Sequence, residues 1–184
     1  MPQSLATERR YIQTYLKILF YTHALRRYDL DPSERDRRNL LLLVADEFQD
    51  IITTSEDGVS DHKVIDRIRG AGACIIGGMQ SELSADPAIG EKKRKVLTLN
   101  MRTRFIFRAA DQEGATTSAD FIGKHKVWKR SISTKDLGSR TVTRHQALEY
   151  RIESSKLMTL PNHKAVIVHP SKATVSRTIH PLYN

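Results

Sequence analysis

The hydrophobic positions in the first half of the chain alternate between the spacing of helices and the continuous runs of buried strands. Residues 7–28 carry apolar side chains at three- and four-residue steps, which predicts a helix. Two short apolar runs, Leu40–Ala45 and Ala73–Met79, each predict a strand buried on both faces. Between them, residues 61–69 predict a helix with Asp61 as its N-cap. Strands that alternate with helices favour a mainly parallel α/β sheet flanked by helices.

The pattern changes after Gly123. Up to that glycine, we expect a further helix, a third strand and a helix capped by Asp111, at 89–101, 103–108 and 111–122. Beyond it, the chain predicts two extended stretches, a short helix and a C-terminal β-hairpin, at 127–133, 142–152, 153–160 and 165–179. We therefore expect one partial domain over 1–184, with an α/β core at 1–123 and an extended segment at 124–184.

Two carboxylates follow the first apolar run, and their position predicts nucleotide chemistry. A buried parallel strand delivers the residues at its end to the carboxyl edge of the sheet, where ligands bind in α/β folds. Asp46 would then hold Mg²⁺ through water, and Glu47 would orient the water that attacks a phosphate. This is the Walker B pattern. The alternative is that both acids simply begin a loop.

Two further polar residues strengthen the nucleotide hypothesis. Gln80 ends the second apolar run, where a polar side chain in motor ATPases senses the γ-phosphate, although it is also suited to cap a strand end. Arg69 ends the helix between the runs and could stabilise transition-state charge on a neighbouring subunit's nucleotide, or merely complement the helix dipole. The order of the motifs favours the catalytic interpretation.

Several segments resemble the type IV coupling proteins, hexameric membrane-anchored ATPases that drive single-stranded DNA into a conjugative secretion channel. The resemblance rests on five stretches: Leu40–Phe48, Ile68–Ser81, Asn100–Phe107, Asp120–Gly123 and Leu160–Val168. It implies a P-loop NTPase motor domain of the RecA-like, FtsK/HerA type, with ATP and Mg²⁺ as cofactors. The implied partners are the relaxosome, the secretion channel and further copies of the chain, at the cytoplasmic face of the bacterial inner membrane.

The same resemblance assigns roles to individual residues. Asp46 and Glu47 match the Walker B pair, Gln80 matches the glutamine after the next strand, and Arg69 matches the arginine that precedes it. Arg104 matches an arginine at a strand start, with a structural or DNA-facing role.

A phosphate cradle of the form Gly-x-x-x-x-Gly-Lys-Ser/Thr is missing from the sequence. Gly72 and Gly77 have the required separation, but Gly78 stands where the lysine is needed. We therefore expect this chain to be a fragment, a split subunit or a truncated remnant that needs a Walker A half. The isolated chain is predicted to bind ATP weakly and to hydrolyse it negligibly.

The charge balance supports a polyanionic partner without identifying it. The sequence has 30 Lys and Arg against 21 Asp and Glu, a formal net charge of +9. The candidates for weak DNA contacts are Lys92, Lys93, Arg94, Lys95 and Arg104, with a solvated helix face as the alternative for the first four. We expect Trp128 to pack in the core rather than stack on a base, and Cys74 to be a buried, inert thiol. No apolar stretch approaches the roughly 20 residues that span a bilayer.

Two other functions stay open at this point. One is a different FtsK/HerA-type DNA translocase or a genome-packaging ATPase. The other is a non-catalytic remnant that binds DNA or a protein through the same surface.

Overall fold

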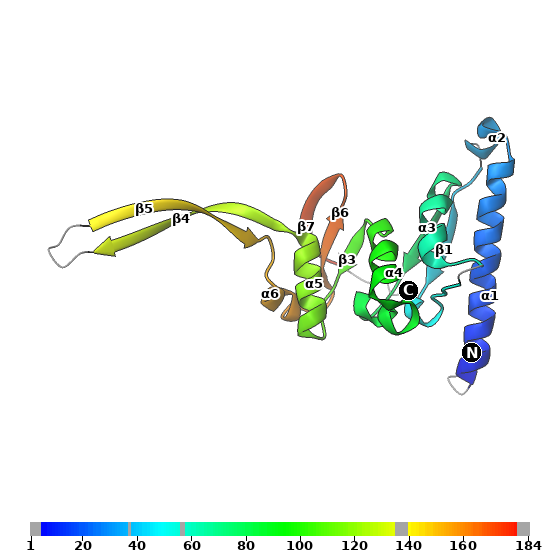
Figure 1. Cartoon of the computed structure of the whole chain (residues 1–184), viewed down its shortest axis with the longest axis horizontal. Coiled ribbons are helices and arrows are strands. Elements are labelled where there is room, and N and C mark those ends of the chain that lie inside the picture. The colour runs from blue at the N-terminus through cyan, green and yellow to red at the C-terminus, as the bar shows by residue number, and fades with distance from the viewer. Residues whose placement is uncertain (1–4, 37, 56–57, 135–139, 180–184) are drawn as a thin grey trace. The chain divides into compact units, whose positions relative to one another are not determined.

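The computed structural model describes residues 5–36, 38–55, 58–134 and 140–179 (Figure 1). They form two compact units, an N-terminal unit up to Arg102 and a C-terminal unit from Thr103. The sequence predicted that the α/β core ends at Gly123. The boundary between the two compact units lies earlier, before the third strand.

The N-terminal unit contains a two-stranded parallel sheet and its helices. Its elements are α1 (Ala6–Leu25), α2 (Pro32–Asp36), β1 (Leu41–Ala45), α3 (Asp61–Gly70), β2 (Ala73–Gly77) and α4 (Asp86–Asn100), with 3₁₀ turns at Arg26–Asp29, Phe48–Asp50 and Glu82–Ala85. The helix and strand predictions for 7–28, 40–45, 61–69 and 73–79 are confirmed. Gly90 interrupts α4 with φ +75°, a conformation that glycine adopts without a steric penalty. Within the described residues, no helix is long and apolar enough to cross a membrane.

Within the described part of the N-terminal unit, one face of the β1–β2 sheet is covered and the other is not. The inward face packs through Ala45, Ala73 and Ile75 against residues of α1, α3 and α4. The other face is open, since Leu42, Val44 and Ile76 are 50%, 67% and 53% exposed. The prediction that both strands are buried on both faces is therefore wrong. Cys74 lies exposed on the open face as well, so the prediction of a buried thiol is wrong for the same reason.

A buried ion pair joins α1 to α3. The Lys17 ammonium group donates to the Asp61 carboxylate at 2.6 Å, and the two side chains are 1% and 0% exposed. The same carboxylate accepts from the Tyr21 hydroxyl and from the backbone N–H of Thr53. Burial, followed by the charge of Asp61, raises the pKa of Tyr21, and burial lowers the pKa of Lys17 against the pull of Asp61. The N-cap of α3 is Ser60, so Asp61 holds two helices together rather than capping one.

The C-terminal unit has its own core. Its elements are β3 (Arg104–Ile106), α5 (Gln112–Ile122), β4 (Lys124–Thr134), β5 (Arg140–Tyr150), α6 (Ser154–Met158), β6 (Lys164–His169) and β7 (Lys172–Thr178). Ala115, Ala119 and Ile122 of α5 pack with Leu157 and Val166. Because of these contacts, α5 is part of the C-terminal unit and not of the unit that contains the β1–β2 sheet.

The third strand does not pair as the sequence predicted. β3 pairs antiparallel with β6, which forms the expected hairpin with β7, and the three make a separate sheet. Ile106, the last residue of β3, packs on the core around α5. Asp111 caps α5 as predicted, because its carboxylate accepts from the Gly114 N–H at 2.6 Å.

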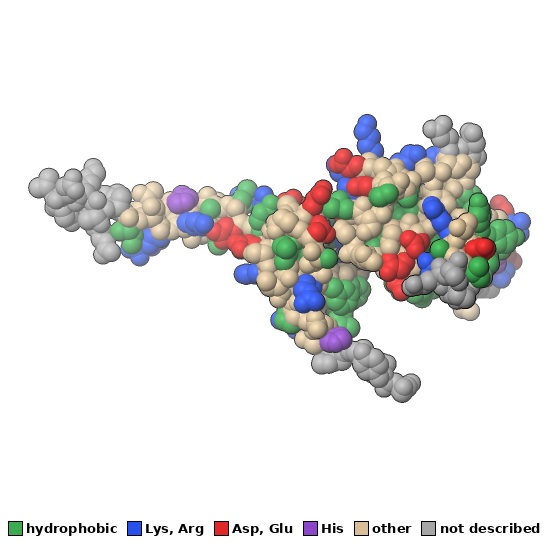
Figure 2. Space-filling model, turned by 90° about the horizontal axis from the view of Figure 1, so that it is seen from below, with side chains coloured by type: hydrophobic (Ala, Val, Ile, Leu, Met, Phe, Trp, Pro, Cys, Tyr) green, Lys and Arg blue, Asp and Glu red, His purple; other side chains and the backbone are tan. Residues whose placement is uncertain are grey.

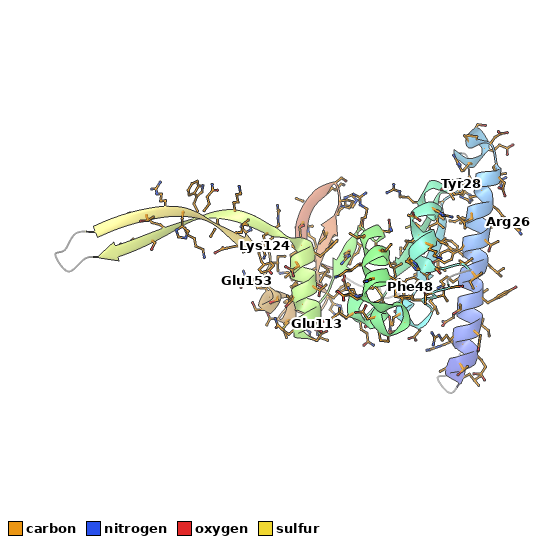
Figure 3. All side chains as sticks on the ribbon, in the orientation of Figure 1. Arg26, Tyr28, Phe48, Glu113, Lys124 and Glu153 are labelled. Atoms are coloured by element: carbon orange, nitrogen blue, oxygen red, sulfur yellow. The ribbon has the colours of Figure 1, made fainter. Side chains whose placement is uncertain are left out.

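The two extended stretches after Gly123 form a long β-ribbon. β4 and β5 pair antiparallel over all eleven residues of each, from Lys124↔Tyr150 to Thr134↔Arg140. Its base is tied to α5, because Arg151 N–H donates to the Gly123 carbonyl at 3.0 Å and the Tyr150 hydroxyl donates to Asp120 at 2.8 Å. Figure 3 labels Lys124 at this base, from which the ribbon leaves the rest of its unit (Figures 1 and 3).

Candidate functional site

The carboxyl ends of β1 and β2 meet at one edge of the parallel pair. Their register ends at Ala45↔Gly77, so Asp46 and Gly78 emerge side by side. Two backbone bonds fix the loops that follow: Gly78 N–H donates to the Ala45 carbonyl at 2.9 Å, and Phe48 N–H donates to the Gly78 carbonyl at 2.8 Å. The edge is therefore built by the backbone as well as by side chains.

Asp46 presents an exposed carboxylate at this edge. Its Oδ1 accepts from the Glu47 N–H at 3.0 Å, which fixes its orientation. A Cβ on residue 78 would lie 3.0 Å from the same oxygen, so glycine leaves the space that the carboxylate occupies. An oriented, exposed carboxylate fits a Mg²⁺ ion held through water.

Glu47 stands on a strained turn. Its φ of 51° and ψ of 50° are left-handed, a conformation that costs a non-glycine residue on the order of 1–3 kcal/mol. The fully buried ring of Phe48, which is labelled in Figure 3, follows Glu47 into the core and rests against Gly77. The Gln49 amide donates to the Glu47 carboxylate. This turn separates Glu47 from the buried Phe48 and leaves the carboxylate at the sheet edge.

Gln80 lies exposed in the loop after β2, two residues beyond Gly78. The structure thus brings three predicted site residues, Asp46, Glu47 and Gln80, to one edge of the sheet. Within the described chain, no three His, Cys, Asp or Glu side chains gather to bind a metal directly, so a cation at Asp46 would depend on water and phosphate oxygens.

Arg69 lies at the other end of the sheet. It is exposed in the last turn of α3, and the turn after that helix leads into the amino end of β2. The five residues of β2, about 16 Å of strand, separate it from the carboxyl edge. The structure therefore does not bring Arg69 together with the other three residues in one subunit.

The predicted DNA contacts on α4 divide into exposed and occupied side chains. Lys92 and Lys95 are exposed, with Lys95 paired to Glu91, and Lys93 donates to Thr54 at 2.6 Å. Arg94 is 5% exposed and makes 2.7 Å bonds to both Glu82 and Asp86. The prediction that Arg94 contacts DNA does not hold here, because its guanidinium group is buried in its own ion pairs.

Two aromatic residues of the C-terminal unit bear on DNA contacts. The guanidinium group of Arg104 stacks 3.5 Å from the ring centroid of Phe121, which favours a structural role. Trp128 is 69% exposed on the β4–β5 ribbon, so the prediction that it packs in the core is wrong. In the sequence, Lys124, Lys126 and Trp128 alternate at every second position, which would place all three on the same exposed face of a strand.

Comparison with known proteins gives one family. A sequence model described as the type IV secretion-system coupling protein DNA-binding domain matches residues 4–179. Among curated proteins, none matches the chain.

Solved coupling proteins share the fold. The plasmid coupling protein TrwB in complex with the non-hydrolysable GTP analogue GDPNP has a TM-score of 0.71 at 16% identity, over 98% of this chain and 39% of that one. TrwB in complex with ADP and Mg²⁺ has a TM-score of 0.60 at 18% identity, over 78% of this chain and 31% of that one. Unbound TrwBdeltaN70, a bacterial conjugative coupling protein, has a TM-score of 0.67 at 17% identity, over 88% and 36%. The predicted fold is confirmed in that the chain shares the fold of part of these coupling proteins, and it spans less than two fifths of their length.

Proposed function

The chain belongs to the type IV secretion-system coupling protein family over residues 4–179, and on that basis we propose that it supplies the acidic edge of the nucleotide site in an ATP-driven single-stranded DNA translocase. One observation carries the proposal: Asp46, Glu47 and Gln80 lie at the same edge of the parallel strands. Ligands of open α/β sheets bind at this edge.

The three residues divide the chemistry between them. With Mg²⁺ and nucleotide bound, Asp46 would hold the water shell of the ion, Glu47 would orient and polarise the attacking water, and Gln80 would contact the γ-phosphate. Arg69, at the opposite end of β2, acts on the nucleotide of a neighbouring copy. TrwB structures with nucleotide analogues and with ADP and Mg²⁺ support these cofactors in the family.

The open sheet face supports a larger assembly. Parallel sheets are covered on both faces, whereas Leu42, Val44 and Ile76 are exposed here. We assign this face to contact with a Walker A half that holds the phosphates. The complete protein would act as a hexamer at the cytoplasmic face of the bacterial inner membrane, where it passes DNA from a relaxosome to the secretion channel.

A fusion tests this proposal. The Walker A-bearing part of a coupling protein such as TrwB is joined ahead of this chain, and ATP hydrolysis is compared with that of the chain alone. We expect negligible turnover by the chain alone and DNA-stimulated turnover by the fusion. Glu47→Gln should abolish turnover while nucleotide binding persists.

The matched control is Asp66→Asn, which removes an exposed carboxylate on α3, away from the sheet edge, and should leave turnover unchanged. Turnover by the chain alone that Glu47→Gln abolishes would contradict the need for a second half. An active fusion insensitive to Glu47→Gln would remove the catalytic assignment and leave a non-catalytic DNA-binding module.

A further inference from the structure

One face of the β4–β5 ribbon combines an exposed indole with unneutralised cations. Side chains alternate between the two faces of a strand, so the observed register defines this surface, which we call the Trp128 face. It comprises Lys124, Lys126, Trp128, Arg130 and Ile132 of β4, and Val142, Arg144, Gln146, Leu148 and Tyr150 of β5. Among the ribbon residues whose side chains the structure describes, this face holds four cations and no acid.

Within β4 and β5, the single acidic residue is Glu149, which lies on the other face. Glu149 pairs there with Lys129 at 2.5 Å, and this contact raises the pKa of Lys129 and lowers that of Glu149. On the Trp128 face, Lys124 stacks over the Tyr150 ring at 4.3 Å. Lys126, Arg130 and Arg144 form no ion pair with any described residue. These three cations have no anion within the described chain to neutralise them.

Arg130 and Arg144 are directly opposite each other in the register. Like charges at opposed positions destabilise an antiparallel pair, because their Cβ atoms are only about 5 Å apart. Both arginines border an open hollow whose lining also includes Trp128 and Lys129. An anion bound in this hollow would convert the repulsion into attraction.

Trp128 identifies the kind of anion. The residue is 69% exposed, although tryptophan is highly buried on average. Lys126 and Arg130 flank it on the same strand face, and Gln146 lies opposite. An aromatic platform among cations is how proteins hold single strands: bases stack on the ring while phosphates contact the cations.

We propose that the Trp128 face binds single-stranded DNA, with Trp128 stacked on a base and with Lys126, Arg130 and Arg144 on the neighbouring phosphates. The inference rests on the proposed function, which supplies the DNA, and it assigns the contact to the ribbon rather than to α4. Figure 2 shows Lys and Arg side chains at several points along the ribbon. A duplex fits this face less well, because its bases are already stacked on one another.

The chain's own fluorescence tests the proposal, since Trp128 is its single tryptophan. The full chain is titrated with oligothymidylate at low salt, and affinity is measured by anisotropy of a labelled oligonucleotide. We expect saturable quenching of the indole. Trp128→Ala should weaken binding about 5- to 150-fold, whereas Trp128→Phe, which keeps a ring, should retain most of the affinity.

Matched arginine pairs locate the contact. Arg130→Ala with Arg144→Ala should weaken binding at least as much as Trp128→Ala. Arg26→Ala with Arg38→Ala removes two exposed cations from a second basic hollow, in the N-terminal unit, and should have little effect. Circular dichroism checks that each variant is folded.

Other outcomes overturn the proposal in distinguishable ways. Binding that depends on Arg26 and Arg38 but not on the ribbon would refute the ribbon site and leave the proposed function intact. Indole changes with phosphatidylserine vesicles but not with oligothymidylate would make the face a membrane contact. A folded chain that binds no single-stranded DNA at low salt would also overturn the proposal, whereas a failure of the proposed function would show separately as an inactive fusion.

Discussion

Charged side chains are treated in opposite ways in the two units. In the N-terminal unit, Lys17 is buried against Asp61, and Arg94 is buried against Glu82 and Asp86. On the C-terminal ribbon, Arg130 and Arg144 face each other in the open and have no acidic partner among the described residues. The cations of the first pair are neutralised by acids of the protein itself, whereas the two ribbon arginines are available to an anion from outside the chain.

Whether a cation has an acidic partner therefore predicts its role, structural or DNA-binding, better than the density of basic residues along the sequence does. The densest basic run, 92–95, contains the buried Arg94, whereas the ribbon cations are spaced along strands. Removing a satisfied cation, or its partner, should therefore cost stability. Removing an unsatisfied one should cost affinity for a polyanion.

The largest effect is expected at Asp61. Asp61→Ala leaves the Lys17 ammonium group buried without its carboxylate and removes the acceptor of Tyr21. We expect the free energy of unfolding to fall by about 3–5 kcal/mol, measured by urea denaturation of the chain. Asp66→Ala, on the exposed side of the same helix, should change it by no more than about 0.5 kcal/mol.

A paired substitution sharpens this prediction. Lys17→Met combined with Asp61→Leu removes both charges and keeps apolar volume, so it should cost much less than Asp61→Ala. A double variant as unstable as the single one would show that the network of Tyr21 and Thr53, not the buried charge, holds α1 to α3.

Arg94→Ala should have a smaller effect on stability. It removes two charge-assisted bonds, but Glu82 and Asp86 keep partial access to water. We expect a loss of about 1.5–3 kcal/mol in the free energy of unfolding, with unchanged affinity for oligothymidylate. If Arg94→Ala instead weakened oligothymidylate binding and left the free energy of unfolding unchanged, Arg94 would be a DNA contact and not a structural cation.

The sequence predicted the elements that depend on local patterns. The strand before Asp46, the Asp111 cap, the short helix at 154–158 and the C-terminal hairpin all follow from runs, caps and turns. The sequence also predicted that Gln80 lies at the same edge of the sheet as Asp46, because the carboxyl ends of parallel strands meet at one edge.

The errors concern contacts and burial that local sequence patterns do not determine. The partner of Asp61 is Lys17, 44 residues away, and no local pattern marks that pair. The partners of Arg94 lie across the interruption at Gly90. Apolar composition at Leu42, Val44 and Trp128 predicted burial, but burial depends on a covering element, which the described chain does not place there.

The smallest predicted effect is a pH dependence at His62. Its Nδ1 is buried without a hydrogen-bond partner among the described residues, and burial, followed by Lys93 and Lys63, lowers the pKa of His62 although Asp61 opposes the shift. The unfolded chain then takes up this proton first as pH falls through about 6.5, so acid reduces stability. Unfolding free energies at pH 7.5 and about pH 5.5 should differ less in His62→Gln than in the parent chain. Equal differences would contradict the shift.

The salt dependence of single-strand binding tests the contrast most directly. The logarithm of the oligothymidylate association constant is plotted against the logarithm of salt concentration for the parent chain, for Arg94→Ala and for Arg130→Ala with Arg144→Ala. Each phosphate contact contributes about 0.7 to the slope, so the ribbon double variant should lose about 1.4 while keeping or slightly gaining stability. Arg94→Ala should keep the parent slope. An unchanged slope in the ribbon variant, or the same loss in Arg94→Ala, would contradict the account.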